Sequence, residues 1–168
     1  MKLIPVIAAS TILLAACATQ SPTRIAATPP PIANAAAPEP GVFTSGRFGA
    51  GEVGLLPESG VRHVIDLTHH SEAPDFDAET ALRSLGIRYD RLPIRGADGL
   101  TRANVEAFDR LLAGADEPVL VHCGSSNRVG AMAALRAAWI QGKSAEEAIA
   151  IGRAWGLTGL ESAVRERL

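Results

Sequence analysis

The sequence predicts a single α/β domain with a mainly parallel, four-stranded sheet flanked by helices. Three observations lead to this fold class. The 168 residues are enough for one domain with a proper core but not for two. Short apolar runs rich in β-branched residues alternate along the chain with longer segments of helical periodicity. Because each such alternation needs a crossover connection, the strands should run parallel with helices on both faces.

The first 16 residues are expected to form a signal peptide of the lipoprotein type. Lys2 precedes an apolar stretch that is too short to span a membrane and suits the core of an export signal. The stretch ends in Leu-Ala-Ala before Cys17, which resembles the lipobox of bacterial lipoproteins. The resemblance implies cleavage before Cys17, lipidation of that residue and membrane anchoring in a bacterial cell envelope, at the outer membrane facing the periplasm. The alternative is a plain secretory signal.

Residues 17–40 are expected to form a tether, and residues 41–168 the folded domain. The tether is rich in Pro and Ala and has almost no large apolar residue, so it should bury too little surface to offset its ordering entropy. If Cys17 is lipidated, Cys123 has no partner for an internal disulfide.

The elements of the domain follow from apolar patterning and from capping residues. Asp77, Thr101 and Ser144 are expected to cap helices, and a second capping box is predicted at Thr158. Gly60, Gly86 and Gly142 are expected to end helices. The predicted strands are 42–44, 61–67, 87–92 and 118–122, and the predicted helices are 51–59, 77–85, 101–112 and 129–141, followed by two that begin at 144 and 158.

The loop after residues 118–122, the most strand-like run in the chain, is the candidate site. In such folds ligands bind at the carboxyl ends of the strands, and Cys123 occupies that position. Small and polar residues then lead to Arg128 at the start of a helix. Loop amides and the positive helix end would bind an oxyanion, and the same field with Arg128 favours a nucleophilic thiolate. The alternatives are a buried free cysteine and a surface arginine.

The succession of strand, His122-Cys123, small-residue loop, Arg128 and helix resembles the cysteine-dependent phosphatases. The upstream runs GVRHVIDL and GIRYDRLPI are similar to those of bacterial dual-specificity-like and tyrosine-phosphatase-like domains. The resemblance implies a phosphatase-like fold that hydrolyses a phosphomonoester of a small molecule or protein, without metal or organic cofactor. Cys123 would form a phosphocysteine, Arg128 would clamp the phosphoryl oxygens, and His122 would support the loop and the thiolate. The substrate-binding residues would be Gly124, Ser125, Ser126, Asn127 and Arg128.

Three departures from this resemblance keep other functions open. Four residues separate Cys123 from Arg128, where the phosphatases have five, and Val129 stands where they usually have Ser or Thr. The shorter spacing is that of rhodanese-like sulfurtransferases, which would carry a Cys123 persulfide, although they usually have Gly in place of Ser126. The alternatives are therefore a sulfurtransferase and a non-catalytic module that binds an oxyanion.

Other polar residues are expected near the same edge of the sheet. A general acid would lie in the loop 93–100, where Asp98 is the candidate, although Ala-Asp-Gly is also explained by turn chemistry alone. His69, His70 and Glu72 are expected in a polar loop beside the pocket, and not as metal ligands. With a net charge of −2 and no stripe of Lys and Arg, the chain is not expected to bind nucleic acid.

Overall fold

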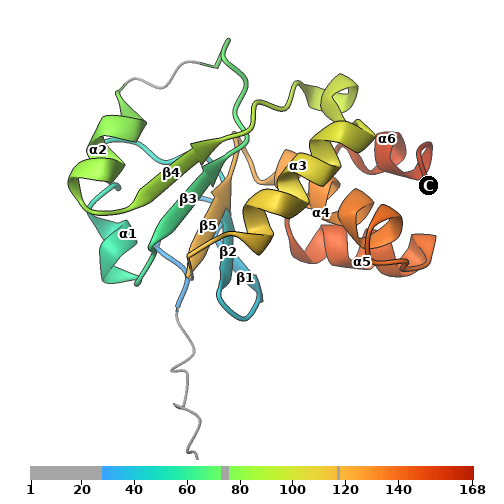
Figure 1. Ribbon diagram of the computed structural model, residues 1–168, viewed down its shortest axis with the longest axis horizontal. Coiled ribbons are helices and arrows are strands. Elements are labelled where there is room, and N and C mark those ends of the chain that lie inside the picture. The colour runs from blue at the N-terminus through green and yellow to red at the C-terminus, as the bar shows by residue number, and fades with distance from the viewer. Residues whose placement is uncertain (1–27, 73–75, 117) are drawn as a thin grey trace, which may run out of the picture.

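The computed structural model describes residues 28–72, 76–116 and 118–168 (Figure 1). The expected signal peptide 1–16, the lipidation site Cys17 and the first part of the expected tether lie outside the described residues.

A five-stranded sheet forms the centre of the domain, in the order β1-β2-β5-β3-β4. Strands β2, β5, β3 and β4 are parallel to one another, as predicted from the sequence. The central strand β5 pairs with β2 on one side and β3 on the other, and every residue of β3 and β5 is buried. The strands span Ala36–Glu39 (β1), Val42–Ser45 (β2), His63–Asp66 (β3), Arg88–Arg91 (β4) and Val119–His122 (β5).

The fifth strand, β1, was not predicted, and it corrects the expected domain boundary. It pairs antiparallel with β2, so that Ala36 lies opposite Thr44, and Gly41 turns the chain between the two strands with φ 78°. Ile32, further upstream, is only 7% exposed and belongs to the core. The folded domain therefore begins before Gly41. Proline is tolerated in β1 because edge strands have unpaired N–H groups.

Helices cover both faces of the sheet (Figure 1). Helices α1 and α2 pack on one face, where they share a core with Phe43, Val64 and Leu120. Helices α3 to α6 pack on the other face, around a larger core that includes Ile65 and Val121. The helices span Leu55–Glu58 (α1), Ala78–Ser84 (α2), Arg102–Ala113 (α3), Asn127–Trp139 (α4), Ala145–Ala154 (α5) and Glu161–Arg165 (α6), with a short 3₁₀ helix at Gly96–Gly99.

Three of the four predicted helix caps are confirmed. The side chains of Asp77 and Thr101 accept N–H bonds from the first turns of α2 and α3, and Ser144 forms the predicted capping box of α5. The capping box at Thr158 is wrong, because α6 begins at Glu161 without a side-chain cap. The amide oxygen of Asn127 accepts the N–H groups in that turn instead.

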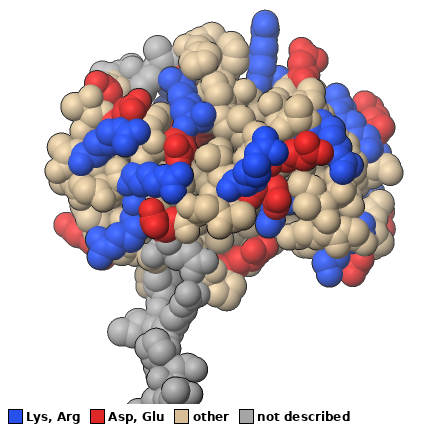
Figure 2. Space-filling view, viewed as in Figure 1, with Lys and Arg blue, Asp and Glu red and all other residues tan. Residues whose placement is uncertain are grey.

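The four parallel strands end at one edge of the sheet, which brings the loops that follow them together. None of the described helices is long and apolar enough to cross a bilayer. On the face shown in Figure 2, Lys and Arg side chains are interspersed with Asp and Glu side chains.

Candidate active site

The central strand β5 carries His122 and then Cys123 to this edge of the sheet. Successive residues of a strand point to opposite faces. Val121 and Cys123 belong to the core under α3 to α6, whereas Leu120 belongs to the core under α1 and α2. The Cys123 thiol is unpaired and has no exposed surface. The side chains of Cys123 and His122 therefore lie on opposite faces of the sheet.

The loop after Cys123 is held by the segment that follows β2. The N–H of Arg47 donates to the carbonyl of Gly124 at 3.2 Å, and the N–H of Cys123 donates to the carbonyl of Ser45 at 3.4 Å. Gly46 and Ser125 form an isolated antiparallel bridge. Strand β2 thus extends its pairing with β5 into the loop and fixes how the loop leaves the sheet.

Ser126 turns the loop into helix α4 through a left-handed backbone conformation with φ 68°. This conformation costs about 1–2 kcal/mol for a residue with a Cβ. The buried Ser126 hydroxyl donates to the carbonyl of Trp155 at 3.1 Å, which ties the turn to the end of α5. A Cβ at Gly156 would lie 2.5 Å from that hydroxyl oxygen, so the glycine provides the space for it. Because of this turn, α4 begins at Asn127 and not at 129 as predicted.

The turn leaves backbone donors at the start of α4. Within the described residues, the N–H groups of Gly124, Ser125, Asn127 and Arg128 have no protein acceptor. The side chains of Ser126 and Asn127 face the α5–α6 side, so these two predicted substrate-binding residues offer backbone groups only. Free amides at the N-terminus of a 13-residue helix form a place where an oxyanion binds.

Arg128, in the first turn of α4, reaches back across the loop. Its side chain is 13% exposed, and a Cβ at Gly124 would lie 3.2 Å from its Nη2, so a larger residue at 124 would have to shift the guanidinium slightly. Burial lowers the pKa of Arg128, but the ion pair with Glu72 and the neighbouring Cys123 sulfur outweigh burial and raise it above its usual range. The structure thus brings Cys123, the loop amides and the guanidinium of Arg128 together.

Glu72 is the partner of Arg128, and sequence reasoning did not find this pair. Its carboxylate oxygens accept from Nη1 and Nη2 of Arg128 at 2.5 and 2.7 Å. It also accepts the N–H of His69 at 3.0 Å and lies 3.4 Å from Nη2 of Arg47. The hydrogen bond with Arg128 lowers the pKa of Glu72, against the opposing effect of burial. The sequence offers one signal for this pair: Glu72 is an acidic residue in the loop after β3, and β3 ends at the same edge of the sheet as β5.

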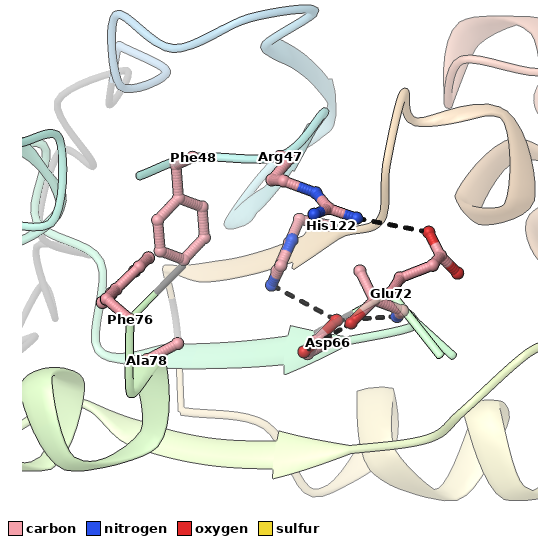
Figure 3. A pocket seen from close by; sticks show the side chains of 8 residues that line it. Arg47, Phe48, Asp66, Glu72, Phe76, Ala78 and His122 are labelled. Atoms are coloured by element: carbon pink, nitrogen blue, oxygen red, sulfur yellow. Dashed lines mark hydrogen bonds and ion pairs between the residues drawn. The ribbon is translucent and has the colours of Figure 1, made fainter. Parts of the chain in front are cut away.

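His122 faces a pocket beside the Cys123 loop (Figure 3). Its ring lies 4.7 Å from the ring of Phe48, and its Nε2 is 3.5 Å from a carboxylate oxygen of Asp66. Neither ring nitrogen has a hydrogen-bond partner of good geometry within the described part of the chain, although the backbone of Cys123 neighbours the ring. Burial lowers the pKa of His122. The pocket is lined by Arg47, Phe48, Asp66, Thr68, Glu72, Phe76, Ala78 and His122.

Asp66 and Asp98 lie in contrasting surroundings. Asp66 is 4% exposed and accepts the N–H and hydroxyl of Thr68 and the phenol of Tyr89, at 2.7, 3.0 and 2.7 Å. It therefore organises the loop after β3. Asp98 is exposed on the 3₁₀ helix Gly96–Gly99, and Arg167 donates to the carbonyls of Ala97 and Leu100 on either side of it.

Comparison with known proteins gives a partial sequence match. No family model matches the chain. The "Beta-lactamase hydrolase-like protein" of two strains of Xylella fastidiosa is 35% identical over 101 residues, which is 58% of this chain. The chain spans only 23% of the length of these relatives.

Solved structures match over most of the chain. Protein nma1982 of Neisseria meningitidis has a TM-score of 0.67 and 24% identity, covering 79% of this chain and 94% of its own. TpbA of P. aeruginosa, solved with pTyr, has a TM-score of 0.60 and 25% identity, with coverages of 80% and 87%. The catalytic domain of the PP-IP phosphatase SIW14 of S. cerevisiae, solved with citrate, has a TM-score of 0.59 and 18% identity, with coverages of 83% and 87%. The chain therefore has the fold of the cysteine-dependent, tyrosine-phosphatase-like phosphatases, as the sequence resemblance implied.

Proposed function

We propose that the protein hydrolyses a phosphomonoester by way of a Cys123 phosphocysteine. The observation that carries this proposal is the loop after β5: free N–H groups follow Cys123 up to the start of α4, and the guanidinium of Arg128 neighbours the Cys123 sulfur. Amides and a guanidinium stabilise the charge that develops on a phosphoryl group during transfer. The likeness of the fold to solved phosphatases supports the same reading.

In the proposed reaction the Cys123 thiolate attacks phosphorus, an S–P bond forms and the ester P–O bond breaks. The leaving oxygen takes a proton from a general acid, for which Asp98 is the candidate. Water then attacks phosphorus, which releases inorganic phosphate and restores the thiolate. Arg128 and the loop amides would hold the phosphoryl oxygens in both steps.

The pocket beside the loop is the surface against which the organic part of the substrate would lie. Phe48 and Phe76 supply apolar surface, and Glu72 belongs both to the pocket and to the pair with Arg128. The leaving group of a phosphoester bound at the loop would extend toward this pocket, because Glu72 lines the pocket and also binds Arg128.

The test is phosphate release from an aryl phosphate by the full chain, with Cys123→Ser as the matched control. We expect turnover in the parent, none in C123S, and one added phosphoryl group on the Cys123 peptide after acid quenching. Activity that survives C123S would refute the mechanism. A persulfide on Cys123 after incubation with thiosulfate, without phosphate release, would instead support sulfur transfer.

We further propose that lipid on Cys17 anchors the protein to a bacterial membrane. The apolar stretch that ends directly before Cys17 motivates this proposal. Mass spectrometry of the expressed full chain should show an acylated N-terminal Cys17 and recovery in the membrane fraction. Cys17→Ser should be recovered in the soluble fraction, and an unmodified parent N-terminus would contradict the proposal.

A further inference from the structure

The side chain of Arg47 carries a positive charge that the fold itself hardly uses. The backbone N–H of Arg47 donates to the carbonyl of Gly124 at 3.2 Å, a bond that any residue with an N–H group could form at this position. Among the described residues, the guanidinium has a single ion-pair partner, Glu72, with 3.4 Å between Nη2 and Oε2. The side chain is 43% exposed, and an exposed pair of this length contributes little to stability. Stability therefore does not explain the charge at this position.

Both carboxylates that line the pocket are engaged by other cations. Glu72 accepts from Nη1 and Nη2 of Arg128 at 2.5 and 2.7 Å, so it lies closer to this guanidinium than to that of Arg47. Asp66 is 4% exposed, and its carboxylate lies 3.7 Å from Nε of Arg91 on β4. A guanidinium has several N–H donors, and only one of those of Arg47 has an acceptor within the part of the chain that the structure describes. Arg47 can therefore bind a further anion without giving up Glu72.

Arg47 is also the positively charged residue of the pocket beside the loop after β5. Figure 3 shows its side chain pointing toward Glu72. Among the described residues that line the pocket it is the only Lys or Arg, and burial lowers the pKa of His122, which favours the neutral ring. Phe48 and Phe76, with ring centroids 6.4 Å apart, supply apolar surface in the same pocket. A leaving group that lay against this surface would contact aromatic rings and a guanidinium together.

We propose that Arg47 determines specificity by binding a second anionic group, on the leaving-group side of the substrate. The substrate class is then a phosphomonoester whose leaving group has an apolar part and carries a carboxylate or a further phosphate. A guanidinium binds either group through charge-assisted hydrogen bonds. This inference rests on the proposed phosphatase function for turnover. The binding of the second anion does not need turnover, so it is tested separately.

The first experiment measures binding by calorimetry to the full chain with Cys123→Ser, which cannot form a phosphocysteine. The probes are the ortho, meta and para isomers of carboxyphenyl phosphate, each paired with the carboxamide of nearly the same shape and no second charge. We expect at least one carboxylate isomer to bind about tenfold more tightly than its carboxamide, because it gains charge-assisted hydrogen bonds. Adding Arg47→Gln should remove this preference.

Arg62→Gln is the matched control for the loss of one positive charge. Arg62 is exposed and directly precedes β3, at the edge of the sheet opposite to the Cys123 loop. The preference for the carboxylate should persist in R62Q. No preference with any isomer, or a preference in R47Q equal to that of the parent background, would overturn the proposal. The same measurement with the phenylene bisphosphates tells a phosphate from a carboxylate as the preferred second anion, because the preferred one loses more affinity with R47Q.

The second experiment measures kcat/KM for the preferred carboxylate ester and for its carboxamide in the full chain with Cys123 intact. We expect R47Q to lower the carboxylate-to-carboxamide ratio of kcat/KM by about tenfold. Arg47→Lys should lower the ratio less, because lysine keeps the charge but not the fork of N–H groups. General damage to the loop by R47Q would lower both values together. A ratio that R47Q leaves unchanged would therefore overturn the proposal.

The two experiments distinguish failure of this inference from failure of the proposed function. If the C123S protein prefers the carboxylate through Arg47 but the parent hydrolyses no ester, the second-anion site stands and the phosphatase function fails. If the parent hydrolyses carboxylate and carboxamide esters equally well and C123S binds them equally, the phosphatase function stands and the second-anion site fails.

Discussion

Replacing Gly130 by alanine should destabilise the domain by forcing apart the two segments that support the Cys123 loop. Gly130 lies in the first half of α4, where a Cβ would meet the backbone N of Leu157 and lie 2.5 Å from the carbonyl oxygen of Gly152 in α5. Neither atom belongs to a flexible side chain, so the two backbones must separate. Overpacking of this kind costs about 3 kcal/mol, at the upper end of its usual range, and the higher helix propensity of alanine returns about 1 kcal/mol.

We therefore expect G130A to lower the free energy of unfolding by about 2 kcal/mol, which in a domain of this size lowers Tm by about 4–8 °C. Urea unfolding followed by circular dichroism measures the first quantity, and a thermal melt measures the second. The matched control is Gly51→Ala, because a Cβ at this exposed position has nothing within 4 Å. If G130A is as stable as G51A, the close approach of α4 to the segment 152–157 is wrong.

Three further predictions concern the same site and its surroundings. Ser126→Gly relieves the left-handed strain but loses the bond to Trp155, so its stability should stay within about 1 kcal/mol of the parent, whereas Ser126→Ala keeps the strain and should lose about 1–3 kcal/mol in urea unfolding. Burial lowers the pKa of both His63 and His122, so folding favours their neutral forms. The free energy of unfolding should be constant above about pH 6.5, the pKa of histidine in the unfolded chain. Below that pH it should fall until the lowered pKa values of the folded state are reached, by at most about 1.4 kcal/mol per pH unit for each histidine. Urea titrations between pH 8 and 5 check this, and a flat profile would contradict it. Asp98→Asn should lower kcat by roughly a hundredfold for an ester with a poor leaving group and little for p-nitrophenyl phosphate, and equal effects on both esters would exclude Asp98 as the acid.

Much of the fold was predictable because local signals and tertiary structure agree. The runs at 61–67 and 118–122 are apolar and β-branched, and both are buried strands in the centre of the sheet. The caps at Thr101 and Ser144 are short-range hydrogen bonds that residue type alone suggests. Strand β1 was missed because Pro and Ala indicate an unstructured tether, while its pairing with β2 depends on an edge that only the folded sheet provides.

The chemical site was found from the sequence only in part. Cys123 and Arg128 lie at the two ends of one short loop, so their spacing in the sequence already predicts that they are neighbours in space. Glu72 lies 56 residues from Arg128, and only the parallel arrangement of β3 and β5 brings them into contact. The bond from Ser126 to Trp155 likewise depends on how α5 packs against α4.

The antiparallel strand β1 has a practical consequence for handling this protein. A fragment cut at Gly41 would lose the hydrogen bonds between Ala36–Glu39 and β2, and would expose the backbone of β2 along its outer side. Bare strand edges recruit other chains, so such a fragment would tend to aggregate whatever the state of its catalytic loop. A fragment for expression should therefore begin upstream of Ile32, because the buried side chain of Ile32 is part of the core on one face of the sheet.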